Sequence, residues 1–478
     1  MLMKNLKFLV LGIAAILFAF CTPPKEPADA QKEELKPVEK VALTPPMGWN
    51  SFDAYDCRIN EAEYKATVDY MAENLLEFGW EYAVIDYIWW HPNPGNWDNP
   101  RRKGHPNLRY KSPGEPLFPE NTRLDEYGRL IPSVERFPSS ANGQGFKPLA
   151  DYVHSKGMKF GIHIMRGVHR YAVFQDLPIK GTSYNMKQIA EPWDTCGWCN
   201  HMWGVDPTKP GAQEYYNSLF EMYAEWGVDF IKADDTMFPP YHEGEIAMMR
   251  KAIDNCGRPM VLSLSCGEAP LGMATHLKEN ANMWRISADF WDDWKSLEHN
   301  FDLLNAWSSH AAPGAWPDAD MLPIGKISLD DRPHGPERMT KFTQPEQYTL
   351  ITLWAIARSP LMIGADLLSM DDFTLSLLTN PEVISVTRNS TGNRQVVRRN
   401  GSCVWIATEP GTGDKFVALF NMKEKEADVE FDLELDYLRG KYNVRDLWNR
   451  KDIGQAEGVL SAKIPPHGAG LYRLQKIN

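Results

Sequence analysis

The chain has 478 residues, 43% of them hydrophobic, and a formal net charge of −12. This size and composition are typical of a globular protein with a large core, because an α/β barrel alone takes up about 250 residues. The acidic balance argues against a nucleic-acid partner, since phosphates would be repelled. The 17 Trp residues suit either a large core or flat platforms on which sugar rings stack.

The N-terminus has the pattern of an export signal. Two lysines precede an apolar run that ends at Phe20 and is too short for a comfortable membrane span. Cys21 follows at once, as in a bacterial lipoprotein, although Phe20 stands where a small residue is usual. We expect a signal over residues 1–21 and a Pro/Lys/Glu-rich linker over 22–40. The protein would then be periplasmic or on the cell surface, with lipid on Cys21 as membrane attachment; a cleaved soluble form or an uncleaved anchor are the alternatives.

Eight short apolar runs alternate with helical stretches between residues 41 and 375. This alternation predicts a parallel sheet with helices outside, and eight units predict closure into a (β/α)8 TIM barrel of the α/β class. The helical pattern is clear over residues 61–78, 213–226 and 344–358. The apolar runs cover residues 47–51, 82–87, 159–165, 229–235, 260–265, 283–289, 318–322 and 359–366.

Polar side chains gather at the C-terminal ends of six of these runs. A barrel places those ends around one mouth, where active sites form. A polar turn after a single strand is common, so the six together carry the inference. They are Asn50, Asp86, His163, Asp234, Asp289 and Asp320. The long connections 88–158 and 167–204 are expected to be walls or lids of that mouth.

Residues 380–478 have a different pattern, with short alternating stretches separated by turn residues. This pattern predicts a small antiparallel β-sandwich domain. We expect a structural role for it, with sugar binding as the lesser alternative.

The pair Cys196 and Cys199 has the spacing of a redox or metal site. A second cysteine pair at zinc spacing is missing, and Asp and His residues nearby are sparse. We therefore expect a local disulfide or free thiols and no metal.

Cleavage of a glycosidic bond with retention needs two carboxyl groups about 5–5.5 Å apart, one as nucleophile and one as acid/base. Asp234 ends the fourth run and Asp289 ends the sixth, so strands two apart can point them across one cavity. Lys232 lies two positions before Asp234, on the same side of the strand, and favours an ionised nucleophile. Apolar neighbours are expected to keep Asp289 protonated, as an acid requires.

Several motifs in order resemble glycoside hydrolase family 27, the α-galactosidase and α-N-acetylgalactosaminidase family. They run from TPPMGWNSFDAYDCRINE (44–61) and YAVIDYIWW through WGVDFIKADD and MWRISADFWDDW to PDADMLPIG, ARSPLMIGADL, NPEVISV and IPPHGAGLYRL. The resemblance covers roughly residues 44–475. It implies a retaining mechanism with Asp234 as nucleophile and Asp289 as acid/base, a carbohydrate substrate, and neither metal nor organic cofactor.

The resemblance also implies roles for substrate-binding residues. Trp49 would be an apolar wall under the sugar. Asp86 and Lys232 would hold ring hydroxyls. Arg285 would hold the hydroxyl next to the reacting carbon, and Asp320 would line the site.

The chain departs from the family at several substrate contacts. Tyr87 stands where the family has the second of two acids that read galactose hydroxyls, and His163 stands where it has a Tyr. Asp235 and Thr236 replace a usual Asn-Cys pair and remove a disulfide partner. Cys266 lies in the segment that sorts galactose from N-acetylgalactosamine. These departures indicate a divergent subgroup.

The first hypothesis is therefore an exo-acting α-galactosidase. A β-L-arabinopyranosidase, whose substrate has the galactose ring stereochemistry without the hydroxymethyl arm, and an α-glucan-releasing enzyme are the alternatives with the same mechanism. An inactive surface glycan-binding protein and a metal or redox enzyme using Cys196 and Cys199 are the alternatives from other classes.

Overall fold

The computed structural model describes residues 40–92, 94, 110–112, 115–116, 122–196, 198–199, 201–329 and 336–477. The predicted signal over 1–21, Cys21 and nearly all of the predicted linker lie outside these residues. Within the described residues, no helix is long and apolar enough to cross a membrane.

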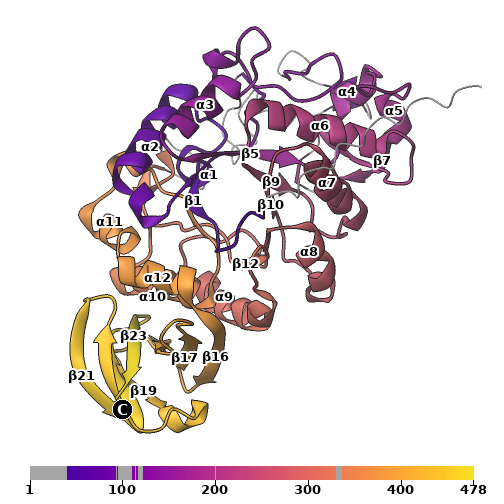
Figure 1. Cartoon of the computed structure of the whole chain (residues 1–478). Helices are drawn as coiled ribbons and strands as arrows, with labels where there is room; N and C mark the ends of the chain where they lie inside the picture. The colour runs from indigo at the N-terminus through magenta and orange to yellow at the C-terminus, as the bar shows by residue number, and fades with distance from the viewer. Residues whose placement is uncertain are drawn as a thin grey trace, which may run out of the picture. The chain divides into compact units, whose positions relative to one another are not determined.

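Eight parallel strands form the predicted barrel (Figure 1). The two edge strands of the sheet, β12 (Trp316–Asp318) and β15 (Leu361–Ile363), are joined just after β12. There Leu322 pairs with Ile363 and donates its backbone N–H to the Met362 carbonyl at 2.8 Å. Each of the eight predicted runs contains or adjoins one strand. In sheet order they are β12 (Trp316–Asp318), β11 (Met283–Arg285), β10 (Val261–Leu264), β9 (Phe230–Asp234), β5 (Lys159–Met165), β2 (Tyr82–Ile85), β1 (Met47–Asn50) and β15 (Leu361–Ile363).

The strands are buried on both faces, as the runs without polar alternation predict. On β2, Tyr82 and Val84 belong to a cluster that fills the barrel interior, whereas Ala83 and Ile85 pack in the larger core that includes the surrounding helices. This filled interior makes the barrel a solid scaffold, so the site forms above it, at the strand ends.

Helices surround the barrel (Figure 1). Capping boxes start two of them, at Asn60 with Glu63 and at Thr343 with Glu346. The three predicted helical stretches are confirmed, but the first ends at Asn74 and continues only as a 3-10 turn. The longer helices are α2 (Glu61–Asn74), α3 (Lys147–Ser155), α6 (Ala212–Trp226), α7 (Glu243–Asn255), α8 (Ala274–Asn280), α9 (Trp294–Trp307), α10 (Gln344–Ala357), α11 (Asp372–Leu378) and α12 (Pro381–Asn389).

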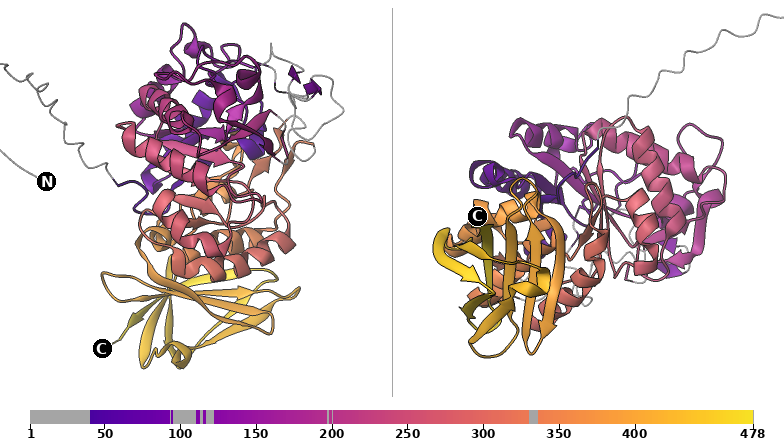
Figure 2. Two further views of the ribbon diagram at one scale, coloured as in Figure 1. Left: turned by 90° about the vertical axis from the view of Figure 1, so that its right-hand side faces the viewer. Right: turned by 60° about the horizontal axis from the view of Figure 1, so that its bottom comes forward.

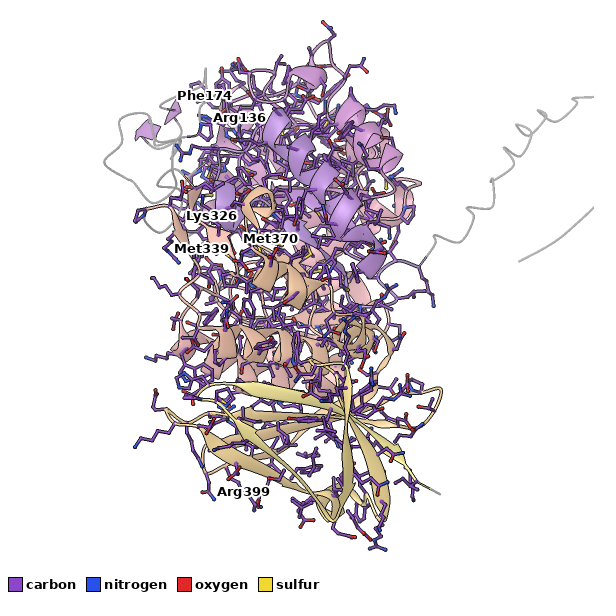
Figure 3. The ribbon with its side chains drawn as sticks, turned by 90° about the vertical axis from the view of Figure 1, so that its left-hand side faces the viewer. Arg136, Phe174, Lys326, Met339, Met370 and Arg399 are labelled. Carbon is purple, nitrogen blue, oxygen red and sulfur yellow. The ribbon has the colours of Figure 1, made fainter. Side chains whose placement is uncertain are left out.

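The connections between barrel units carry short elements of their own. Lys326 and Met339, which pair between β13 and β14, are labelled together in Figure 3. The short helices are α1 (Phe52–Tyr55), α4 (Arg170–Phe174) and α5 (Met186–Ile189). The short strands are β3 (Tyr110–Ser112), β4 (Glu115–Pro116), β6 (Val168–His169), β7 (Ala190–Thr195), β8 (Met202–Val205), β13 (Lys326–Ile327) and β14 (Arg338–Met339).

The C-terminal part is the predicted antiparallel β-sandwich (Figure 2). The helix α12 occupies residues 381–389, so the strands of the sandwich begin at Thr391 and not at the predicted residue 380. Its own apolar core includes Val404, Val417 and Phe431. The strands are β16 (Thr391–Arg399), β17 (Ser402–Thr408), β18 (Lys415–Asn421), β19 (Ala427–Asp432), β20 (Lys441–Asp446), β21 (Lys451–Glu457), β22 (Val459–Ile464) and β23 (Ala469–Lys476).

Candidate active site

A pocket of about 300 Å³ lies where the parallel strands end. It collects every predicted site residue except Trp49 and His163. Its charged walls are Asp53, Asp86, Lys232, Asp234, Arg285, Asp289 and Asp320, and its aromatic walls are Phe52, Tyr87, Trp198, Phe238, Phe290 and Trp291.

Asp234 is the last residue of β9 and is almost fully buried. Its Oδ2 lies 3.0 Å from Nε2 of His163, on the neighbouring strand β5. Burial alone would raise the pKa of Asp234, but the hydrogen bond from His163 and the charge of Lys232 outweigh it and hold the pKa well below its usual range. Asp234 is therefore ionised, as a nucleophile requires.

Asp289 lies in the loop after β11, and β11 is separated from β9 only by β10. The apolar enclosure predicted for Asp289 is wrong. Its side chain is 72% exposed, and Nη2 of Arg285 lies 3.2 Å from its Oδ1. The adjacent Phe290 is buried, and its ring packs against Trp354. Asp289 is thus a carboxyl at the open side of the pocket, where a leaving-group oxygen can reach it.

Arg285 links the loop that carries Asp289 to the next strand end. Its Nη2 lies 2.8 Å from Oδ2 of Asp320, and the same oxygen accepts the backbone N–H of Phe290 at 2.7 Å. Asp320 therefore holds both the cation beside Asp289 and the backbone that follows it. Burial raises the pKa of Asp320, and Arg285 opposes that rise.

Asp86 and Lys232 form a buried ion pair on one wall. Oδ2 of Asp86 accepts from Lys232 Nζ at 2.9 Å and from Asn50 Nδ2 at 2.7 Å. Burial would raise the pKa of Asp86, but the charge of Lys232 lowers it overall. This pair gives the pocket a fixed hydrogen-bond acceptor and a fixed donor.

Tyr87 occupies the position next to Asp86 as an uncharged wall. Burial raises the pKa of its phenol well above the usual range. Its hydroxyl lies 3.3 and 3.4 Å from the two ring nitrogens of His201, and its ring packs edge-on against Trp90 and Trp198. This part of the pocket is therefore built from aromatic rings.

Two predicted sugar contacts lie behind the pocket. Trp49 is fully buried, and its indole N–H donates to the Ala365 carbonyl at 2.8 Å, so the residue predicted to be the apolar wall is a core residue. The pocket wall is Phe52, which α1 presents three positions later. His163 is also fully buried and contacts Asp234 from behind. His163 therefore holds the Asp234 carboxylate rather than lining the pocket.

Sequence reasoning missed Asp53 and Trp198. Asp53 lies in the first family-like motif, from which only Trp49 was predicted to bind the sugar. The buried Oδ2 of Asp53 has no hydrogen-bond partner in the described part of the chain. Burial, with the nearby charge of Asp320, raises the pKa of Asp53 well above its usual range. Trp198 lies between Cys196 and Cys199, whose spacing predicted thiol chemistry and not an aromatic pocket wall.

The cysteines near the pocket are free thiols in this structure. Cys196 and Cys199 are buried, and the Cys199 N–H donates to the Cys196 sulfur at 3.3 Å. Cys266 lines the pocket, and burial raises the pKa of its thiol.

One nearby group has the spacing of a metal site. Ligand atoms of Asp194, His242 and Glu245 lie within 4.8 Å of one another. Nη1 of Arg166 lies 2.7 Å from both Asp194 Oδ2 and Glu245 Oε1. The guanidinium thus already supplies a cation to these carboxylates.

Comparisons with known proteins agree with the geometry. A family model described as alpha galactosidase A matches residues 204–389, and one described as the alpha galactosidase C-terminal beta sandwich domain matches 400–474. An α-galactosidase of Coffea arabica is 30% identical over 442 residues, or 91% of this chain and 94% of that enzyme. α-Galactosidase 2 of Arabidopsis thaliana is 29% identical over 457 residues, or 94% of each chain.

Among solved structures, a family 27 β-L-arabinopyranosidase from Geobacillus stearothermophilus is 47% identical with a TM-score of 0.85. The match covers 91% of this chain and 97% of that one. A variant of that enzyme has been crystallised with arabinose. The first family model begins at residue 204, so it includes Asp234 and Asp289 but not Tyr87 or His163. Of the departures seen in the sequence, Tyr87 and His163 therefore lie in the part of the barrel that this model does not match, whereas Asp235, Thr236 and Cys266 lie within the match.

Proposed function

The chain belongs to glycoside hydrolase family 27 and is a glycosidase, and from this premise we propose that it releases terminal β-L-arabinopyranosyl groups with retention of anomeric configuration. The observation that carries the proposal is Tyr87. The family has a carboxylate there that reads galactose hydroxyls, whereas Tyr87 is an uncharged, buried ring whose hydroxyl faces His201.

A missing carboxylate matters because a sugar hydroxyl that enters a buried site without a hydrogen-bond partner loses about 1–3 kcal/mol. The hydroxymethyl arm of galactose, placed against the rings of Tyr87 and Trp198, would lose a hydrogen bond to its hydroxyl in this way. L-Arabinopyranose has the same ring hydroxyls and lacks the arm. The 47% identity to a β-L-arabinopyranosidase supports the same substrate.

The proposed chemistry uses the two carboxyls that line the pocket, Asp234 and Asp289. Ionised Asp234 attacks the anomeric carbon while Asp289 gives its proton to the leaving oxygen, so the glycosidic bond breaks as a glycosyl ester forms. Asp289, now a carboxylate, takes a proton from water, whose oxygen attacks the same carbon and releases Asp234. Two inversions leave the configuration retained.

The sugar is tested with a panel of aryl glycosides. We expect kcat/KM for p-nitrophenyl β-L-arabinopyranoside to exceed that for p-nitrophenyl α-D-galactopyranoside by more than about tenfold, the free energy of one hydrogen bond. Equal values, or a preference for the galactoside, would contradict the proposal.

α-Galactosidase activity is the second candidate, because curated relatives that span nearly the whole chain carry that name. The variant Tyr87→Asp restores a carboxylate beside Asp86. If arabinopyranoside is the natural substrate, this variant shifts the preference toward galactoside; Tyr87→Phe, the matched control, does not.

Retention is tested separately from the sugar. In Asp234→Ala, turnover falls to background, and added azide restores cleavage with a glycosyl azide of inverted configuration. An inverted sugar from the unmutated enzyme, seen by early-time NMR, would contradict the mechanism.

Export is part of the proposal, on the strength of the N-terminal segment. Expression in a bacterial host with labelled palmitate should label the full chain and not Cys21→Ser. Label in neither, with processed protein in the periplasm, would indicate the cleaved soluble form.

A further inference from the structure

Arg166 is the centre of a buried ionic cluster that the mechanism above does not use. It directly follows β5, and its side chain is 1% exposed. Its Nη atoms donate to both carboxylate oxygens of Asp194 at 2.7 and 3.0 Å, to Asp235 at 2.7 Å and to Glu245 at 2.7 Å. Its Nε donates to the Asp235 carbonyl at 2.8 Å. All the N–H groups of the guanidinium therefore have acceptors.

One side of this cluster holds the nucleophile strand. The backbone N–H of Arg166 donates to the carbonyl of Asp234 at 3.0 Å, and its side chain binds both the carbonyl and the carboxylate of Asp235. Glu245 belongs to α7, so its ion pair with Arg166 joins this helix to the cluster. The Tyr216 hydroxyl donates to the other carboxylate oxygen of Glu245.

The other side holds the segment that carries the aromatic wall. Asp194 belongs to β7, and the chain continues from it to Trp198, which lines the pocket, and His201, which faces Tyr87. Burial contributes little to holding β7, because the neighbouring Trp193 is 92% exposed. β7 pairs with β8, and Nδ1 of His242 lies 3.5 Å from Asp194 Oδ2. The two-pronged contact of Asp194 with Arg166 adds a charged, bidentate tether to this strand.

Gly204 in β8 is consistent with this tether. A Cβ on Gly204 would lie 2.2 Å from Asp194 Oδ2 and 2.7 Å from Arg166 Nη1. The ion pair thus lies directly against the β8 backbone, and a side chain there would displace it.

We propose that Asp194 is a specificity-determining positioning residue, which acts through Arg166 to hold Trp198 and His201 against Tyr87 in the wall of the sugar pocket. The inference rests on the proposed function only in that this wall selects the sugar. Asp194 itself does not line the pocket.

The test is Asp194→Asn, which keeps the shape of the side chain and removes one charge and one acceptor. Asp235 and Glu245 still pair with Arg166, so the nucleophile strand keeps its support. The matched control is Asp206→Asn, the same change at the far end of the segment, where the carboxylate caps the exposed turn at Thr208 and lies 3.8 Å from Nζ of Lys209.

Hydrogen bonds to charged groups contribute about 1.5–3 kcal/mol, equivalent to about tenfold or more. We expect Asp194→Asn to raise KM for the better substrate about tenfold, to leave kcat within about twofold, and to change the arabinopyranoside-to-galactoside ratio of kcat/KM at least about fivefold. Asp206→Asn should change none of these more than about twofold. A fall in kcat at constant KM, or an unchanged ratio, would overturn the proposal.

Two further variants keep the proposal testable if Asp194→Asn folds poorly or acts elsewhere. Gly204→Ala displaces Asp194 without changing charge and should change the ratio in the same direction, even where Asp194→Asn folds poorly. In a Trp198→Leu background, Asp194→Asn should change the ratio no further, whereas additive effects would contradict action through the wall. The substrate preferred by the unmutated enzyme is the reference, so a preference for galactoside refutes the arabinopyranosidase proposal alone.

Discussion

His163 should control the acid limit of activity, because its Nε2 lies 3.0 Å from Oδ2 of Asp234. Its Nδ1 is buried with no hydrogen-bond partner within the described ranges. A proton on Nδ1 would be stranded there, so the arrangement favours a proton on Nε2 that is donated to the nucleophile. The substitution His163→Phe keeps a ring in the space and removes this donor.

The size of the effect follows from the strength of the bond. A hydrogen bond to a charged group contributes about 1.5–3 kcal/mol, and about 1.4 kcal/mol corresponds to one pH unit. The pKa of Asp234 is depressed, and the ionised form is active, so activity is lost as pH falls through that pKa. Without the donor the pKa rises, and the acid limb of the kcat/KM profile should move to higher pH by about one to two units.

The assay is kcat/KM against pH with an aryl glycoside for the unmutated enzyme and His163→Phe. His154→Phe is the matched control, because His154 makes a similar contact of 2.7 Å with Asp229 away from the pocket. The control should leave the acid limb in place. An unmoved acid limb in His163→Phe, with kcat/KM within about twofold at neutral pH, would refute the reasoning.

Three other changes have defined outcomes. Asp289→Ala should lower turnover of glycosides with poor leaving groups by about a hundredfold or more, and of activated aryl glycosides much less, in parallel steady-state assays; equal losses would exclude Asp289 as the acid. Arg136→Ala (Figure 3) removes the donor to several buried backbone carbonyls and should lower the free energy of unfolding by about 3 kcal/mol in urea titrations; a loss under about 0.5 kcal/mol would contradict this. Gly364→Ala places a Cβ 2.0 Å from Asp53 Oδ2 and should lower both Tm and kcat/KM, whereas Gly411→Ala, with open space around it, should change neither.

The barrel could be predicted from the sequence because its strands are short apolar runs and its helices carry their own start signals. Asn60 and Thr343 cap their helices as the residue types predict. The sandwich was predicted to start at residue 380, too early, because residues 381–389 form the helix α12 and not a strand.

The placement of Asp234 and Asp289 at one pocket could be predicted for the same reason. Asp234 and Asp289 lie at or just beyond the carboxyl ends of strands two apart, and a barrel brings such ends to one mouth. The local environment could not be predicted. The apolar residues that flank Asp289 suggested an enclosure, but Phe290 is buried against Trp354 and the Asp289 carboxyl is exposed beside Arg285.

The sequence by itself determined the fold class, the position of the two aspartates at strand ends and the departures at Tyr87 and His163, because periodicity and motifs are local properties of the chain. Only the tertiary structure decided that Phe52 rather than Trp49 is the wall, that His163 supports Asp234 from behind, and that Arg166 joins the nucleophile strand to the segment with Trp198. Those relations depend on which way side chains turn at the ends of strands far apart in sequence, and packing of the whole barrel sets that direction.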